Sequence, residues 1–330
     1  MALGVIAAAT NSIGLGRRTQ AQTPSTERTV TMRSAAPSLT IAVPLTMVVA
    51  HTDHAHGIAV DLQATGTSST IIVDAVLSGQ ADFGSPDTAD APQAIRQGAN
   101  LKISAAIVNN LQVMVIRDDI VAKLAVSPDA PIADRVRALK GLILGTGAVG
   151  STHYQILRSY LKQYDVDPDK DVRLVGLGDT AALISSIEQK RYDAIAYASP
   201  IVDFAVAKGI AKVWISGPRG ANNVKTCVIV TRPDTIEKRR ADVDALRAAL
   251  ADALAAVRSD HAAIGRTLHD KYFSKLDSDV WSEAWNGTTT AYPDSLAFTQ
   301  EAYDYWIAND PKGADSYKHV DYARITDVTA

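Results

Sequence analysis

Hydrophobic residues in the first third of the chain form short runs that alternate with amphipathic segments. The runs at 28–35, 57–65 and 101–108 predict strands, and the apolar spacing in 71–79 predicts a helix that ends at a glycine. A loop and a short apolar helix are expected after the first strand. A short strand, a turn at Gly84-Ser85-Pro86 and a further helix are expected before the third.

The same alternation returns between about 135 and 215, where four apolar runs are separated by helical segments. One predicted helix begins after Ser151, a favoured N-cap residue. Two series in which strands and helices alternate are typical of parallel sheets. From 235 to 330 the signals are mostly helical, with Trp281, Trp285 and Trp306 as large apolar anchors.

Two apolar β runs, 111–118 and 225–232, bracket the second series. This arrangement indicates that the chain leaves a first domain, builds a second and returns, and paired extended connections form a natural hinge. We therefore expect a first lobe of residues 29–115 plus 228–330 and a second lobe of residues 116–227.

Residues 1–28 differ from the rest because an apolar, small-residue stretch is followed by a polar, turn-prone one. This pattern is typical of a secretory signal, with Thr19-Gln20-Ala21 as the cleavage-like site, although a basic start is missing. No cysteine follows the apolar stretch, so no lipid anchor is expected there. We expect export to the periplasm or cell exterior. The alternative is a disordered leader without an address.

Composition narrows the classes of partner. The chain is 47% hydrophobic and 21% charged, with a formal net charge of −3, and it lacks the clustered basic face of a nucleic-acid-binding protein. No apolar run reaches the ~18–20 residues that a membrane span requires. The single cysteine, Cys227, excludes an intrachain disulfide and a Cys-rich zinc site, and its apolar neighbours predict a buried, unreactive thiol.

Gly145, Gly147 and Gly150 form a G-x-G-x-x-G motif between a predicted strand and a predicted helix. A dinucleotide site also needs an acidic residue about 20 residues further on. The first acid after the next strand is Asp179, which lies 29 residues after Gly150 and begins a helix. The motif thus departs from the dinucleotide pattern, and we expect no cofactor.

A helix that begins after a glycine loop presents unpaired amides and the positive end of its dipole, which favour polar or anionic groups. The arrangement occurs twice here, at 66–70 and at 147–152. Because ligands bind beyond the carboxyl ends of parallel strands, the two helix starts are predicted to face one shared ligand.

Several segments carry a family resemblance. "SGQADFG" at 78–84, "DPDKDV" at 167–172 and "YDAIAYASP" at 192–200 occur in the order found in type II periplasmic-type solute-binding proteins. The chain resembles the NMT1-like group that serves ABC importers of nitrate, sulfonates, taurine or thiamine precursors. The resemblance implies an α/β fold of two Rossmann-like lobes with mixed, mainly parallel sheets joined by two crossing strands.

The resemblance also implies a function. We expect a monomeric receptor that captures a small polar or anionic organic solute, such as a sulfonate or an aromatic carboxylate, and delivers it to an ABC permease in the membrane. The alternatives are an enzyme on the same fold, such as a thiamine-pyrimidine synthase-like protein, or a sensor domain. The cysteine-rich segment of the yeast synthases is absent, so their iron-dependent chemistry is not implied.

By the family pattern, the loop after each strand faces the ligand. For each Ser or Thr, the alternative is a capping role that serves only its own helix. The candidates in the first lobe are Thr67, Ser68, Ser69, Ser85, Pro86, Asn109 and Asn110. Those in the second lobe are Gly150, Ser151, Thr152, Asp179, Thr180, Ser199 and Pro200.

Two further groups of residues could carry chemistry. His51, His54 and His56 could hold zinc, but without an evident carboxylate or cysteine partner beyond Asp53 we expect a solvated helix end and no metal. Asp87 would repel an anion if it faced inward, and could instead favour an amine-bearing ligand or cap the helix after Pro86.

Overall fold

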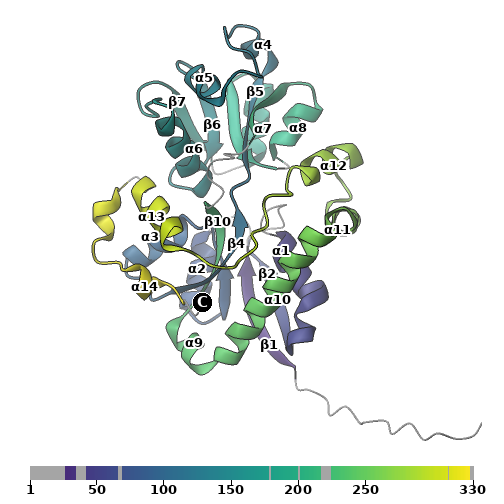
Figure 1. The fold of residues 1–330 in the computed structure, drawn as a ribbon, viewed down its shortest axis with the longest axis vertical. Coiled ribbons are helices and arrows are strands. Elements are labelled where there is room, and N and C mark those ends of the chain that lie inside the picture. Colours follow the sequence, from purple (N-terminus) through teal and green to yellow (C-terminus); the bar gives the residue numbers. More distant parts are fainter. Residues whose placement is uncertain are drawn as a thin grey trace, which may run out of the picture.

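The computed structural model describes residues 27–34, 42–65, 69–177, 180–199, 201–216, 224–310 and 312–327. These residues form two lobes, which lie one above the other in Figure 1. Each lobe is built around a five-stranded sheet, with helices on its faces.

The sheet of the first lobe has the strand order β2-β1-β3-β10-β4. β1 runs parallel to β2 and β3, whereas β10 runs antiparallel to β3 and β4. The strands predicted at 28–35, 57–65 and 101–108 are confirmed. The bounds are β1 Arg28–Ser34, β2 Ile58–Ala64, β3 Phe83–Ser85, β4 Lys102–Asn109 and β10 Lys225–Thr231.

Helices cover both faces of this sheet. α2 packs directly onto β3: a Cβ on Gly84 would lie 2.8 Å from the side chains of Ile72 and Val76, so only glycine permits this approach. Gly84 and Ser85, predicted as a turn, therefore belong to a short strand, because helix packing overrides the local turn preference. The helices are α1 Ala42–Met47 with a π-helical continuation Val48–Thr52, α2 Ser69–Leu77, α3 Asp90–Arg96, α9 Pro233–Lys238 and α10 Arg240–Ser259.

The second lobe repeats the plan, with strand order β7-β6-β8-β5-β9. β6 is parallel to β7 and β8, and β5 is antiparallel to β8 and β9. The strands are β5 Gln112–Arg117, β6 Ile143–Gly147, β7 Arg173–Leu177, β8 Ala194–Ala198 and β9 Ala211–Ser216. The helices are α4 Asp118–Val121, α5 Ile132–Arg137, α6 Thr152–Gln163, α7 Thr180–Glu188 and α8 Ile201–Ala207.

The chain passes from the first sheet to the second between β4 and β5, at residues 110–111, and returns between β9 and β10. The lobe boundaries drawn from the sequence, at 115/116 and 227/228, fall inside β5 and β10. β5 belongs wholly to the second sheet and β10 wholly to the first. Both strands are almost entirely buried, and a continuous apolar run carries no periodicity that would assign it to one sheet.

The C-terminal part contacts both lobes. α12 packs against α8 and α13 packs against α6. The segment between α12 and α13 runs along β4 in Figure 1, where the amide of Asn109 donates to the carbonyl of Ala291 over 2.7 Å. Trp281, Trp285 and Trp306 are buried, as predicted. The elements are α11 His261–Leu268 with a π-helical end His269–Phe273, α12 Ser278–Asn286, α13 Gln300–Asn309, a 3₁₀ turn Ala314–Tyr317 and α14 Tyr322–Ile325.

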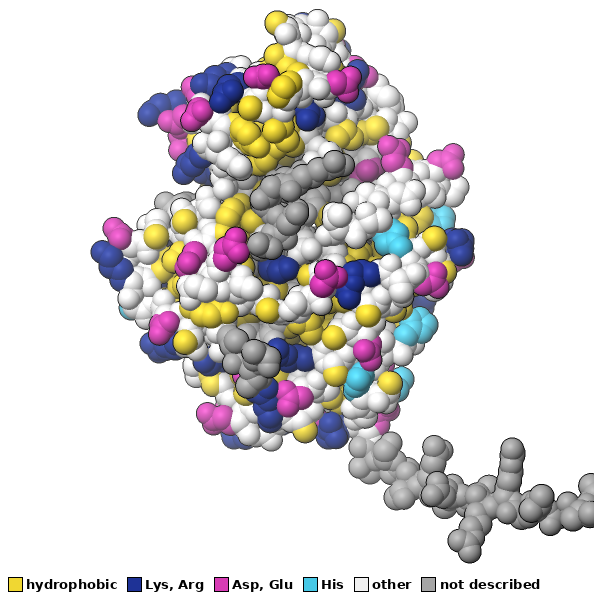
Figure 2. All heavy atoms as spheres, in the orientation of Figure 1, with side chains coloured by type: hydrophobic (Ala, Val, Ile, Leu, Met, Phe, Trp, Pro, Cys, Tyr) yellow, Lys and Arg dark blue, Asp and Glu magenta, His cyan; other side chains and the backbone are white. Residues whose placement is uncertain are grey.

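The surface carries charges of both signs. On the face in Figure 2, basic and acidic side chains are interspersed over both lobes and form no continuous patch of one sign. Among the residues described, no helix combines the length and apolar character needed to cross a membrane.

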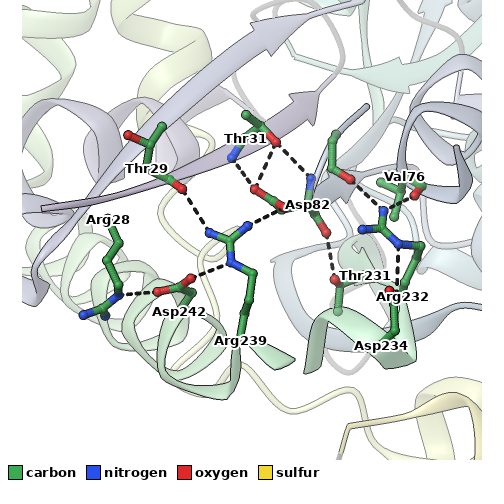
Figure 3. Close-up of polar contacts among 11 residues, drawn as sticks. Arg28, Thr29, Thr31, Val76, Asp82, Thr231, Arg232, Asp234, Arg239 and Asp242 are labelled. Carbon is green, nitrogen blue, oxygen red and sulfur yellow. Dashed lines mark hydrogen bonds and ion pairs between the residues drawn. The ribbon is translucent and has the colours of Figure 1, made fainter. Parts of the chain in front are cut away.

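A network of charged side chains fixes the start of α10 to the sheet of the first lobe (Figure 3). In Figure 1 the start of α10 lies at the end of the first lobe far from the second. Arg239 pairs with Asp82 and donates to Asp242 over 2.7 Å and to the carbonyl of Thr29 over 3.0 Å. Asp82 also accepts from the amide of Thr31 over 2.9 Å. One guanidinium therefore joins α10 to β1 and to the residue before β3.

We predict that Arg239→Ala lowers the free energy of unfolding by about 2 kcal/mol, because it removes charge-assisted hydrogen bonds to two carboxylates that are largely shielded from solvent. Urea denaturation followed by circular dichroism measures the change. Lys238→Ala is the matched control, since among the described residues Lys238 pairs only with Asp234 on the surface and its loss should cost less than about 0.5 kcal/mol. Equal effects of the two substitutions would contradict the assignment.

Candidate functional site

The glycine loop after β6 positions the start of α6. Gly150 has φ +86°, a left-handed conformation that glycine adopts without strain. Ser151 is the N-cap, as predicted, and its Oγ accepts from the amide of Tyr154 over 3.3 Å. The amides of Thr152 and His153 have no acceptor among the described residues. The tip of α6 therefore offers two free donors at the positive end of a twelve-residue helix.

The opposing surface is the loop between β3 and α3 in the first lobe. Ser85 is fully buried, and its Oγ lies 3.0 Å from Sγ of Cys227. Ser69, the first residue of α2, accepts from the amide of Asp87 over 3.1 Å, and its hydroxyl also favours the ionised form of Asp90. Ser69 and Ser85 therefore hold this loop in place. This is the structural role expected of these hydroxyls as the alternative to ligand contact.

The two predicted surfaces meet at the junction of the lobes. The amide of Ala89 donates to Oγ1 of Thr152 over 3.3 Å, and Nε2 of Gln93 donates to the carbonyl of Gly150 over 3.4 Å. Ile156 of α6 is buried in the same apolar cluster as Val73 and other residues of the first lobe. The structure therefore brings the tip of α6 against the loop that follows β3.

An aromatic pair from the second lobe lies beside this contact. The ring centroids of His153 and Tyr197 lie 4.0 Å apart. Nδ1 of His153 lies 3.4 Å from Oε1 of Gln112. Burial lowers the pKa of His153 to about 4, so the imidazole is neutral at pH 7. Burial, with a contribution from the charge of Asp87, raises the pKa of Tyr197 to about 12. The charge on Asp87 is thus felt across the lobe junction.

The pKa values of both carboxyl groups on the first-lobe side, those of Asp87 and Asp90, are raised. Burial raises the pKa of Asp87, and the neighbouring charge of Asp90 raises it further. Burial also raises the pKa of Asp90, although its hydrogen bond with Ser69 opposes this shift. The junction is therefore acidic on one side and rich in amide donors on the other.

Asn109 and Asn110 lie where the chain crosses between the lobes. Oδ1 of Asn109 accepts from Nζ of Lys225 over 2.7 Å, and its Nδ2 donates to the carbonyl of Thr290 over 3.0 Å. Oδ1 of Asn110 accepts from the amide of Gln112 over 2.9 Å, which forms the predicted turn. The buried Nδ2 of Asn110 has no partner among the described residues. Asn109 secures the crossing, while Asn110 retains one free donor.

The structure describes only some of the remaining candidate residues. Ser199 follows β8 and is buried, and its hydroxyl opposes the rise that burial causes in the pKa of Asp203. Thr180 is the first residue of α7. Pro86 is buried beside Cys227, whose Sγ lies 3.5 Å from its carbonyl oxygen. Four predicted positions lie outside the described residues: Thr67, Ser68, Asp179 and Pro200.

The histidine-rich segment lies away from the junction, beside α10. His54 contacts Glu27 through Nδ1, and Nε2 of His56 lies 2.8 Å from Oδ2 of Asp252. No group of three potential metal ligands is arranged for an ion within the described ranges. Each of these two histidines thus has its own carboxylate partner.

Tyr197, Gln112 and Gln93 line the junction but were not among the predicted residues. Tyr197 could have been found, because it lies at the carboxyl end of β8, a strand parallel to β6, where ligand-facing residues are expected. Gln93 carried no such signal, since it lies inside α3 and reaches Gly150 only through the packing of the lobes.

Most of the chain matches the model of a known protein family. The model of the NMT1-like family matches residues 27–267. The chain belongs to the NMT1-like family. No curated protein sequence matches this NMT1-like chain.

Solved structures share the fold at low sequence identity. The periplasmic aliphatic sulphonate binding protein SsuA from Escherichia coli is 16% identical, with a TM-score of 0.68 over 88% of this chain and 92% of that one. A putative sulfonate-binding SsuA from Methylobacillus flagellatus is 14% identical, with a TM-score of 0.69 over 91% and 92%. The nitrate-binding NrtA from Synechocystis is 16% identical, with a TM-score of 0.57 over 76% and 68%. The predicted two-lobed α/β architecture is therefore confirmed.

The burial of His153 makes stability depend on pH. Its pKa is about 4 in the folded protein and about 6.5 in the unfolded chain, so the unfolded chain binds the extra proton between these values. Stability is therefore complete above pH 6.5 and declines as the pH falls toward 4. We predict that His153→Phe removes about 2 kcal/mol of the loss between pH 7 and pH 5.

Urea denaturation at the two pH values measures this difference. The exposed His319, substituted by Phe, provides the matched control and should leave the pH dependence unchanged. A wild-type pH profile in His153→Phe would show that the imidazole is not buried in its neutral form.

Proposed function

We propose that this chain is the extracytoplasmic solute-binding component of an ABC importer. It captures one small polar or anionic organic solute, such as a sulfonate or an aromatic carboxylate, between its two lobes. The observation that carries the proposal is the meeting of the α6 tip with the loop after β3. The family, and neighbours whose names describe sulfonate-binding and nitrate-binding proteins, support the same role.

The free amides of Thr152 and His153 bind the polar end of the solute, helped by the positive end of the α6 dipole. The crossing at residues 110–111 is where one lobe turns relative to the other. Lobe closure around the solute then favours the conformation that the membrane permease binds. In this role the protein is exported, acts as a monomer and releases the solute chemically unchanged.

The two hydroxyls at the opposed helix starts provide a test. We predict that the double variant Ser69→Ala/Ser151→Ala weakens solute binding by about 1–3 kcal/mol, or about 5- to 150-fold in Kd, through lost hydrogen bonds and a less ordered β3–α3 loop. Candidate solutes come from a thermal-shift screen of sulfonates, aromatic carboxylates, nitrate and pyrimidines. Isothermal titration calorimetry of the best of them gives the affinity.

Ser259→Ala is the control, since Ser259 is exposed at the end of α10 and its hydroxyl donates to the carbonyl of Ala256 in the same helix. Unchanged affinity in the double variant would contradict the site. Mass spectrometry of the solute after prolonged incubation separates a receptor from an enzyme: a receptor binds stoichiometrically and returns the solute intact, whereas any product contradicts the proposed role.

A further inference from the structure

The main chain at Asp87 is held in place by two elements of the first lobe. Its amide donates to Oγ of Ser69 at the start of α2, over 3.1 Å. Its backbone also forms an antiparallel bridge with Cys227 of β10, and the next amide, that of Thr88, donates to the carbonyl of Thr226 over 3.0 Å. The fold therefore fixes the main chain from which the Asp87 carboxylate extends.

The groups around this carboxylate are neutral or negative at pH 7. Asp90 on α3 is a second acid, and the burial of Cys227 on β10 raises its thiol pKa well above the usual range. From the second lobe, Tyr197 on β8 keeps its proton, and the adjacent His153 on α6 is neutral. No element packed here supplies a counter-charge among the described residues.

The carboxylate of Asp87 lacks the charged partners that other acids of the first lobe have among the described residues. Within the described part of the chain it accepts no hydrogen bond and forms no ion pair, whereas Asp242 is paired with both Arg28 and Arg239. The cation on the neighbouring strand, Lys225, bonds Asn109 at the crossing instead. Asp87 is nevertheless only partly buried, so the residue is not sealed off from solvent.

An uncompensated carboxylate in a buried site is costly, and a partner with opposite charge and N–H donors removes that cost. A sulfonate or carboxylate group placed beside Asp87 would instead meet a like charge. Since specificity is a difference of affinities, Asp87 selects as much by repelling the wrong solute as by binding the right one.

We propose that Asp87 recognises a protonated amine on the solute, so that this receptor takes up amine-bearing organic solutes. The inference rests on the proposed function and narrows its solute class. The α6 tip, on the facing lobe, remains available to the acceptor group at the other end of the same molecule.

The test compares matched compounds that differ only in the group offered to Asp87. One set is benzylamine, benzyl alcohol and benzoate; the other is 4-aminobutan-1-ol, 1,4-butanediol and 4-hydroxybutanoate. At pH 8, where Asp87 is ionised, at least one amine should raise the melting temperature by about 2 °C or more at millimolar concentration, beyond its alcohol and acid counterparts. The shift should shrink at pH 6, where Asp87 takes up a proton.

Asp87→Asn should abolish the amine-dependent shift. Without ligand, the same variant should melt at a higher temperature than the wild type at pH 8, and by a smaller margin at pH 5, because the folded state no longer has to bury a charge or take up a proton at Asp87. Asp74→Asn is the matched control: it removes the same charge from the exposed side of α2 and should behave like the wild type.

Three results would overturn amine recognition: no shift with any amine, a shift that survives in Asp87→Asn, or a shift with the acids alone. The last result would leave the receptor function standing with an anionic solute. Conversion of any compound to a product would overturn the receptor function itself.

Discussion

The pairing of β4 with β10 is the constraint on which the two-lobed arrangement depends. The strands are neighbours in the first sheet, with Asn109 opposite Lys225. The outgoing connection starts directly after Asn109, and the returning connection ends directly before Lys225. Both therefore leave the first lobe at one point, and the hydrogen bond between these two side chains lies at that point. Two connections held together define an axis, so the second lobe can turn about it.

Much of the fold could be predicted because strand–helix alternation leaves a local signal. The runs that became β1, β2 and β4 were delimited to within about one residue, and Ser151 was identified as a cap from its place after a glycine loop. Assignment of β5 and β10 to a sheet could not be made in this way. A fully buried strand has no polar face, and only its partners in space determine where it belongs.

The candidate site was predicted less completely, for a different reason. Hydroxyl residues beyond strand ends are visible in a sequence, but whether a hydroxyl is free depends on what the fold places beside it. Ser69 and Ser85 lie where expected, yet their bonds go to Asp87 and Cys227. The electrostatic character of the junction was equally hidden. It arises because Asp87, Tyr197 and His153, from three separate segments, come together partly buried and without a cation among the described residues.

The C-terminal helices add a mechanical consequence. α12 packs against α8, and α13 packs against α6. The C-terminal segment therefore contacts the second lobe through both α6 and α8. The same segment also lies along β4, close to the crossing at residues 110–111. In the proposed receptor, separation of the lobes would require α6 and α8 to slide over these helices. The C-terminal segment would then act as a mechanical restraint on the amplitude of lobe opening.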